Sequence, residues 1–318
     1  METQPPYAAT GISAVVPLLD ERESLAELAQ RLTAVLESLA GDAYEVIFVD
    51  DGSRDGSFDV IRSLHAQNRR IHGIRFRRNY GKSAALAVGF ERARYGLVVT
   101  LDADLQDDPN EIPKLLAMIE EGYDVVSGWK HVRHDPLEKR LPSKLFNAVT
   151  SLVSGIRLHD FNCGLKAYRA EVTRTLTIYG EMHRYIPALA HWEGFRVTEL
   201  PVQHHRRKYG RSKFGASRYV KGFLDLLTVV LTTRYLKRPL HLFGSIGTLL
   251  LVAGFAIALV LTIEWALGGT YLTNRPLLLM AVAFMIVGMQ LISIGLIGEL
   301  VVRQSQSTRE YHIREQLE

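Results

Sequence analysis

Four aspartates crowd into the stretch TLDADLQDDP, residues 100–109, directly after the apolar run YGLVV. They are Asp102, Asp104, Asp107 and Asp108. Clustered carboxylates repel one another and gain nothing from burial unless a partner neutralises them. Asp102 and Asp104, with the side-chain oxygen of Gln106, offer hard oxygen ligands for Mg²⁺ or Mn²⁺, which would bridge the oxygens of a diphosphate. A solvated acidic turn is the simpler alternative.

A second acidic pair, Asp50 and Asp51, opens the stretch DDGSRDGS after another apolar run. Carboxylates at such a place accept hydrogen bonds from ribose hydroxyls or a base N–H, and Gly52 permits the tight turn. Asp20 and Glu21 follow a third apolar run in the same way. Together with the first cluster, these residues favour a site for a nucleotide diphosphate.

The N-terminal part of the chain has a pattern that would bring these stretches together. Short β-rich runs alternate there with helical patterns. The β-rich runs are ISAVVPL, YEVIFVDD, IHGIRF, GLVVTLD and YDVVSG, and the helical patterns include ESLAELAQRLTAVLESL and KSAALAVGFERARY. This alternation predicts an α/β domain with a mainly parallel sheet covered on both faces. Because ligands of such sheets bind beyond the carboxyl ends of the strands, we expect the acidic stretches to meet at one edge.

The C-terminal part contains two long uncharged runs. No Asp, Glu, Lys or Arg lies between Arg238 and Glu264, or between Arg275 and Glu299. Each run can cross a bilayer at about 1.5 Å per residue, which predicts a transmembrane hairpin rather than two buried helices of a soluble protein. Basic residues flank its outer ends, namely Arg234, Lys237, Arg238, Arg303, Arg309 and Arg314. By the positive-inside rule, both ends and the N-terminal domain are expected on the cytoplasmic side of the membrane.

The composition of the 318 residues narrows the classes of partner. Lys and Arg number 38 against 34 Asp and Glu, a net charge of +4, which suits phosphates or lipid headgroups. No nucleic-acid partner is expected. The single cysteine, Cys163, excludes an intramolecular disulfide and a cysteine-rich zinc site. Residues 1–10 have neither the basic flank nor the apolar run of a signal peptide, so none is expected.

Six ordered motifs give the chain a resemblance to a known family. They are VVPLLDERESL, VDDGSRDGS, RNYGKSAAL, DADLQDDP, DFNCGLKAYR and RRKYGRSKFG. With them the chain resembles the inverting family-two glycosyltransferases of GT-A (Rossmann-like) fold. More narrowly, it resembles the polyprenyl-phosphate sugar synthases related to dolichyl-phosphate mannose synthase and bacterial polyprenyl-phosphate glucosyltransferases, some of which carry a C-terminal membrane hairpin. One departure is Leu19-Asp20-Glu21, where many relatives have Tyr-Asn-Glu.

The resemblance implies roles for individual residues. It assigns nucleotide-sugar binding to Pro17, Leu18, Glu21, Asp50, Asp51, Lys82, Asp102, Ala103 and Asp104. Asp102, Asp104 and Gln106 match the family's ligands for the metal and the diphosphate. Asp160 matches an acidic position near the reaction centre and is the candidate for assisting the acceptor, with a turn or helix cap as the alternative. A phosphate acceptor is already anionic near neutral pH, so Asp160 is able to orient it rather than deprotonate it.

Basic residues cluster in two places. Lys130 and Arg133 follow the fifth predicted strand, and HHRRKYGRSK begins at His204. We expect the phosphates of donor and lipid to bind Lys130, Arg133, Arg206, Arg207 and Lys213. A juxtamembrane patch that attracts anionic headgroups is the alternative. Residues 214–238 mix a large apolar face with Arg and Lys, which predicts amphipathic interfacial helices.

The sequence therefore predicts four segments. They are a cytosolic GT-A catalytic domain (1–213), interfacial helices (214–238), two transmembrane helices (239–302) and a cytosolic tail (303–318). The chain is expected to transfer a sugar from a nucleotide diphosphate sugar to a polyprenyl phosphate, with inversion. A protein or polysaccharide acceptor, an inactive membrane scaffold and a transporter are the alternatives. Glycines such as Gly244 and Gly247 permit close helix approach, which leaves a homo-oligomer open.

Overall fold

The structure, a computed structural model, describes most of the chain. The described residues are 5–130, 147, 150–151, 154–205, 208–209, 239–268 and 275–305. The chain divides into two compact units, Met1–Leu226 and Leu227–Glu318, and each is described by itself. The predicted interfacial helices of residues 214–238 lie outside the described residues, as does most of the predicted tail.

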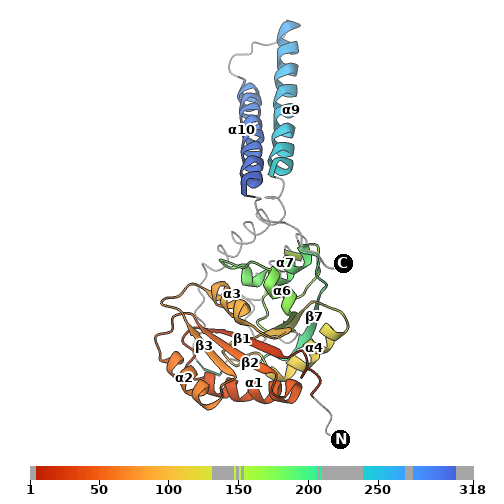
Figure 1. The fold of residues 1–318 in the computed structure, drawn as a ribbon. Helices are drawn as coiled ribbons and strands as arrows, with labels where there is room; N and C mark the ends of the chain where they lie inside the picture. Colours follow the sequence, from red (N-terminus) through yellow and green to blue (C-terminus); the bar gives the residue numbers. More distant parts are fainter. Residues whose placement is uncertain are drawn as a thin grey trace. The chain divides into compact units, whose positions relative to one another are not determined.

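Seven strands form one mixed sheet in the first unit, in the order β3-β2-β1-β4-β6-β5-β7 (Figure 1). The strands are β1 (Ile12–Leu18), β2 (Tyr44–Asp50), β3 (Ile71–Arg75), β4 (Leu97–Thr100), β5 (Val125–Lys130), β6 (Lys166–Arg169) and β7 (Val197–Val202). β6 runs antiparallel to β4 and β5, and the other described pairs are parallel. The predicted mainly parallel sheet is confirmed.

The strands β1, β2 and β4 are buried along their whole length. Their sequences are near-continuous apolar runs, as expected of parallel strands that have helices on both faces. The register sets Leu18 beside Asp50 and Val15 beside Thr100. The acidic stretches after these three strands therefore leave the sheet at the same edge.

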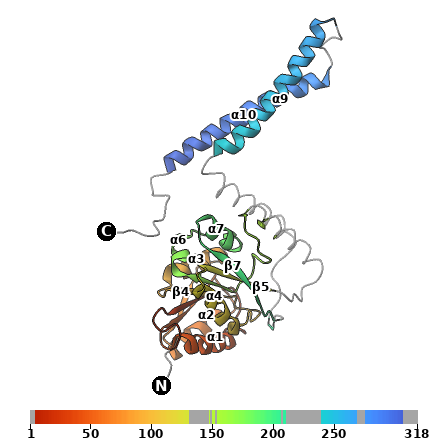
Figure 2. The ribbon, with the colours of Figure 1, turned by 90° about the vertical axis from the view of Figure 1, so that its right-hand side faces the viewer.

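Helices cover both faces of the sheet (Figures 1 and 2). One face carries α1 (Leu25–Ala40), α2 (Ser57–Gln67), the 3₁₀ turn η1 (Pro109–Glu111) and α4 (Ile112–Glu120), and the other carries α3 (Lys82–Arg92), α6 (Ala170–Thr175), the turn η2 (Met182–Arg184) and α7 (Ile186–Trp192). α1 buries a stripe of leucines spaced three or four residues apart, from Leu25 to Leu39. Gly89 brings α3 against β1, because a Cβ there would lie 2.2 Å from Val15 Cγ1.

The strands β6 and β7 are not among the predicted ones. β6 has four residues, too few to show a pattern, and β7 contains Pro201, which argues against a central strand. β7 lies at the end of the strand order, where a proline is tolerated. Because β6 lies between β4 and β5, the segment just before it reaches the middle of the carboxyl edge.

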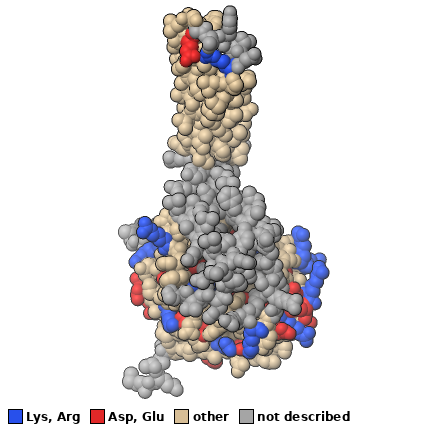
Figure 3. Space-filling view, turned by 180° about the vertical axis from the view of Figure 1, so that it is seen from behind, with Lys and Arg blue, Asp and Glu red and all other residues tan. Residues whose placement is uncertain are grey.

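The second unit is a hairpin of two long helices, α9 (Pro239–Ala266) and α10 (Pro276–Ser305). Both are long and apolar enough to cross a membrane, with mean hydropathy values of 2.6 and 2.5. On the face seen in Figure 3, the hairpin is uncharged along most of its length. A Cβ on Gly247 or Gly288 would lie 2.6 Å from the carbonyl oxygen of the other. The two helices therefore pack through glycines.

Candidate functional site

Asp102 and Lys82 form the centre of the candidate site. Asp102 follows β4, and its carboxylate makes an ion pair with the ammonium group of Lys82, the first residue of α3. Both residues line a small cavity together with Pro17 and with other polar and apolar side chains. The structure thus brings three predicted site residues together at the carboxyl edge of the sheet.

The loop that carries Asp102 and Asp104 is fixed from both sides. Asp104 is almost buried, and its Oδ1 accepts the backbone N–H of Gln106 at 3.1 Å. Leu105, between them, adopts a positive φ of 60° and is held there by burial in the core. The N–H of His205 donates to the carbonyl oxygen of Gln106 at 2.8 Å, and the Gln106 amide nitrogen donates to the carbonyl oxygen of His205 at 3.3 Å. The residues after β7 therefore set the position of this loop.

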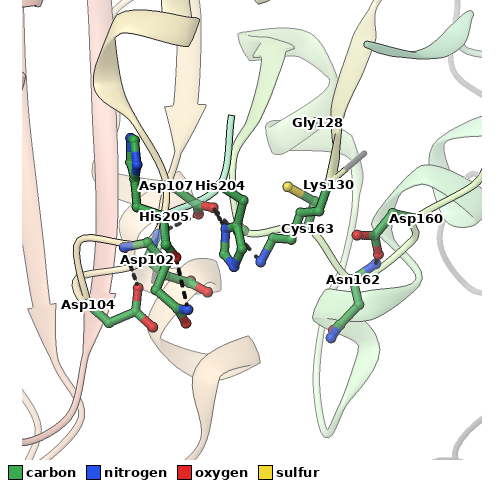
Figure 4. A network of polar contacts seen from close by, with 12 residues as sticks. Asp102, Asp104, Asp107, Gly128, Lys130, Asp160, Asn162, Cys163, His204 and His205 are labelled. Carbon is green, nitrogen blue, oxygen red and sulfur yellow. Dashed lines mark hydrogen bonds and ion pairs between the residues drawn. The ribbon is translucent and has the colours of Figure 1, made fainter. Parts of the chain in front are cut away.

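Asp107, which is buried, forms a polar cluster with Lys130 and His204 beside Asp102 (Figure 4). Lys130 Nζ lies 3.9 Å and His204 Nδ1 3.5 Å from Asp107 Oδ1. Burial acts to raise the pKa of Asp107, but Lys130 and His204 outweigh it and hold that pKa well below its usual range. Burial alone would lower the pKa of Lys130, but Asp107 raises it above its ordinary value. Both groups are therefore charged at neutral pH, so the predicted phosphate-binding Lys130 is a permanent cation.

Asp50 ends β2, and Asp51 begins the loop that follows it at the carboxyl edge of the sheet. The two carboxylate oxygens of Asp51 accept the N–H of Tyr80 at 2.6 Å and of Gly81 at 2.9 Å. Burial raises the pKa of Asp51, and these two N–H groups partly oppose the shift. Asp50 is fully buried, and its Oδ1 accepts the N–H of Ser53 at 2.8 Å. The pair thus shapes the turn after β2 and holds the chain just before Lys82.

The other residues predicted to bind the nucleotide sugar lie nearby. Pro17 and Leu18 end β1, and Leu18 is buried. Glu21 lies in the following loop, where its N–H donates to Ser57 Oγ at 3.0 Å. Ala103 is buried within the loop between Asp102 and Asp104. The structure therefore places these residues around the carboxyl ends of β1 and β4.

Asp160 is buried near the other side of the cavity. Its Oδ1 accepts the N–H of Asn162 at 3.0 Å, and Asn162 lines the cavity that Asp102 also lines. Asp160 is close enough to Lys130 and Lys166 to act on the pKa of each, in the raising direction. Figure 4 shows Asp160 and Asn162 across the site from Asp102. Asp160 therefore belongs to the same charged site as Asp102.

The oxygen ligands predicted for a metal fit a hard divalent cation. Asp102 and Asp104 supply carboxylates, and the hydrogen bond from its amide nitrogen leaves Gln106 its amide oxygen as the ligand. Asp102 already holds one cation, the Lys82 ammonium. Within the described part of the chain, no three His, Cys, Asp or Glu side chains are placed to hold a metal by themselves. Mg²⁺ sites take one or two carboxylates and complete the shell with substrate phosphates and water, and Asp102 and Asp104 supply two such carboxylates.

The sequence reasoning missed polar residues of the cavity, among them Asn162, Lys166 and His183. Lys166 is buried at the start of β6, where burial lowers its pKa and its ammonium donates to the carbonyl oxygen of Cys163. A lysine within the strand-like run GLKAY is the signal that could have found it. His183 packs on α3, with its Nδ1 and its N–H both 3.0 Å from Ser83 Oγ. No pattern in the sequence marks His183.

Most of the predicted phosphate-binding residues lie outside the described part of the chain. They are Arg133, Arg206, Arg207 and Lys213. Lys130, the last residue of β5, is described above. The phosphate clamp formed by the other four therefore stays a prediction.

Comparison with known sequences gives matches along almost the whole chain. Residues 13–177 match the model of Glycosyl transferase family 2. The chain is 38% identical over 306 residues to the undecaprenyl-phosphate 4-deoxy-4-formamido-L-arabinose transferase of Pseudomonas paraeruginosa. This match covers 96% of this chain and 88% of the relative. The protein of the same name from Salmonella enteritidis is 37% identical over 294 residues, with 92% and 88% covered.

Solved structures share the fold of the first unit. Glucosyl-3-phosphoglycerate synthase from Mycobacterium tuberculosis, in complex with phosphoglyceric acid, has a TM-score of 0.55 at 20% identity over 71% of this chain and 81% of that one. Mannosyl-3-phosphoglycerate synthase from Rubrobacter xylanophilus has a TM-score of 0.55 at 16% identity over 70% and 74%. Another structure of the mycobacterial enzyme, with a TM-score of 0.53, contains Mn²⁺, UDP-glucose and glycerol 3-phosphate. These neighbours confirm the predicted GT-A fold.

Proposed function

This chain belongs to glycosyl transferase family 2, and from that premise we propose that it transfers a sugar from a nucleotide diphosphate sugar to a polyprenyl phosphate, with inversion. The relatives at 37–38% identity are named for a transfer to undecaprenyl phosphate. The observation that carries the proposal is the Lys82–Asp102 ion pair, which lines a cavity at the carboxyl edge of the sheet. Ligands of such sheets bind at this edge. The Lys82 ammonium can contact a diphosphate directly, and the Asp102 carboxylate can contact it through a metal ion.

The proposed reaction is a single displacement at the anomeric carbon. An oxygen of the lipid phosphate attacks this carbon on the face opposite the leaving group and forms a new C–O bond. The C–O bond to the diphosphate breaks, and its electron pair leaves with the nucleoside diphosphate. The lipid phosphate is already anionic near neutral pH, so Asp160 orients the acceptor and takes no proton from it. The product is a polyprenyl-phosphate sugar of inverted configuration.

The charged residues of the site stabilise the leaving group. Asp102, Asp104 and Gln106 are the residues that we propose to hold Mg²⁺ or Mn²⁺, which would neutralise the charge that develops on the diphosphate. Lys82 makes an ion pair with Asp102, so its ammonium group adds a positive charge beside the proposed metal and diphosphate. Lys130, kept charged by Asp107, faces the same site from β5. Arg133, Arg206, Arg207 and Lys213 complete the phosphate contacts in this proposal.

The hairpin of α9 and α10 supports a location at a membrane. Large apolar side chains are exposed along both helices, and lipid would cover them. We place the hairpin in a bacterial inner membrane, with the first unit on the cytoplasmic side, because the basic residues flank the outer ends of the hairpin. Enzyme and lipid acceptor are then confined to one surface, which raises their effective concentration.

Product analysis with defined substrates tests this function. The full-length protein in detergent is given undecaprenyl phosphate and a panel of nucleotide sugars that includes UDP-glucose, GDP-mannose and the UDP derivative of 4-deoxy-4-formamido-L-arabinose. Mass spectrometry should detect one lipid-linked sugar, and NMR should show inverted anomeric configuration. Release of the nucleoside diphosphate should require the lipid phosphate and should stop in the Asp102→Asn variant. Transfer to a protein or polysaccharide with no lipid product would contradict the proposal.

A further inference from the structure

Glu199, on β7, accepts a converging set of hydrogen bonds from His159 and Asp160. The N–H of His159 lies 2.9 and 2.8 Å from the two carboxylate oxygens of Glu199, and the N–H of Asp160 lies 3.4 Å from one of them. The ring nitrogen Nδ1 of His159 lies 2.5 Å from Oε1 of the same carboxylate. One side chain therefore fixes the main chain at two consecutive residues.

The ring of His159 is held on its other side by Trp129, the residue before Lys130 on β5. The two rings stack with centroids 4.0 Å apart and planes 17° apart. The His159 side chain is nevertheless 65% exposed. The Glu199 side chain that it contacts is only 12% exposed. The contacts of Glu199 include the backbone N–H groups of both residues 159 and 160.

The turn that Glu199 holds carries the side chain of Asp160 into the candidate site. Asp160 is buried, and its Oδ1 accepts the N–H of Asn162, a residue of the cavity. This side chain is also close enough to Lys130 and Lys166 to raise the pKa of each. A group that orients a reacting phosphate has to be held to within about 0.5 Å.

We propose that Glu199 is a positioning residue for Asp160. The inference rests on the proposed function, in which Asp160 orients the lipid phosphate. A carboxylate that receives two N–H groups makes charge-assisted hydrogen bonds, which are shorter and stronger than neutral ones. Glu199 therefore fixes the backbone from which the Asp160 side chain extends. A plain structural tie between β7 and the preceding turn is the competing explanation.

Steady-state kinetics of Glu199→Ala and Glu199→Gln test the proposal. Glu199→Ala should lower kcat about ten-fold, because Asp160 loses its fixed position, whereas KM for the nucleotide sugar should stay within about two-fold. The kcat of Glu199→Gln should lie between those of Glu199→Ala and the wild type, since its amide oxygen still accepts one N–H. Glu121→Gln, at an exposed position after α4, is the matched control and should keep wild-type values. A wild-type kcat in Glu199→Ala would overturn the proposal.

A double-mutant cycle with Asp160→Asn separates positioning from a structural tie. If Glu199 acts through Asp160, Glu199→Ala should cost little further activity in the Asp160→Asn background. Equal losses in both backgrounds would support the structural tie and overturn the proposal.

Hydrogen exchange provides a readout that does not depend on turnover. The amides of residues 159 and 160 should exchange faster in Glu199→Ala than in wild type, and unchanged exchange would overturn the proposal. Wild-type protein that makes no lipid-linked sugar would refute the proposed function, while the exchange rates would still decide whether Glu199 fixes this turn.

Discussion

Gly164 leaves the space that the carboxylate of Asp102 occupies. A Cβ built on Gly164 would lie 2.6 Å from Asp102 Cγ and 2.7 Å from Oδ2 of both Asp102 and Asp107. Two carboxylates therefore converge on one residue that has no side chain. The glycine is required by this close approach, since its φ lies outside the left-handed region.

Gly164→Ala should weaken nucleotide binding. The added methyl group displaces the Asp102 carboxylate, so affinity for the nucleoside diphosphate of the donor with Mn²⁺ should fall by about ten-fold or more, as measured by calorimetry. Gly73→Ala is the matched control, because a Cβ on this residue of β3 would lie 2.6 Å from Ile61 Cγ2 on α2. That variant should lose thermal stability and keep its affinity for the same nucleotide. Wild-type affinity in Gly164→Ala would refute the role given to the Asp102 carboxylate.

Asp104→Asn should separate metal binding from folding. Asn keeps an oxygen that accepts the N–H of Gln106, so the free energy of unfolding should change by no more than about 0.5 kcal/mol. The lost charge should remove most activity with Mg²⁺ or Mn²⁺. Activity and urea unfolding of the variant are compared with those of the wild type. Wild-type turnover that EDTA does not reduce would rule out a metal at this position.

The buried thiol of Cys163 should make the fold sensitive to alkali. Burial raises the pKa of Cys163 to about 12, against about 8.5 in an unfolded chain. The native state therefore binds this proton more tightly, and its stabilising effect is complete below about pH 8.5 and is lost as pH rises towards 12. Between about pH 8.5 and 10, wild-type stability should fall by about 1 kcal/mol per pH unit more than that of Cys163→Ala. Urea unfolding at several pH values measures this difference, and parallel curves for the two proteins would contradict it.

The basic loop should act in detergent as well as on vesicles. If Arg207 and Lys213 bind reacting phosphates, Ala at either position removes a contact worth about 1.5 to 3 kcal/mol, or about one to two orders of magnitude in kcat/KM. This loss should persist in detergent with a short-chain acceptor. A headgroup patch would instead give normal detergent kinetics and a salt-sensitive loss of vesicle binding. Wild-type detergent rates in both variants would transfer the phosphate-binding role to Lys130 and Arg133.

The part of the fold that the sequence predicts is the part that repeats one simple pattern. The strands β1 to β5 and the helices α1 and α3 follow from apolar runs and helical periodicity, with ends shifted by up to three residues. β6 was missed because KAYR is short and polar at both ends, and its order between β4 and β5 depends on contacts that are distant along the chain. Length and local composition carry no information on such contacts.

For the candidate site, too, the sequence predicts some features, and only the structure shows the others. Asp102, Lys82 and Pro17 meet in the cavity because each ends or begins an element at the carboxyl edge. That Asp51 binds the nucleotide stays a prediction, and the structure shows that its two oxygens accept the N–H groups of Tyr80 and Gly81. Acidic residue types show that a carboxylate is present, and only the folded loops show which donor it accepts. The role proposed for Glu199 likewise depends on contacts that only the folded structure shows.

The position of β6 also orders events during synthesis. β3, β2, β1 and β4 pair among themselves, so this half of the sheet is complete soon after Thr100 leaves the ribosome. β5 emerges next, but its described partners are β6 and β7, which come later in the chain. Until β6 has emerged, β4 lacks its described antiparallel partner. A nascent chain thus acquires the strands of the nucleotide side first, and its exposed β4 edge needs protection from other chains until residue 169 has emerged.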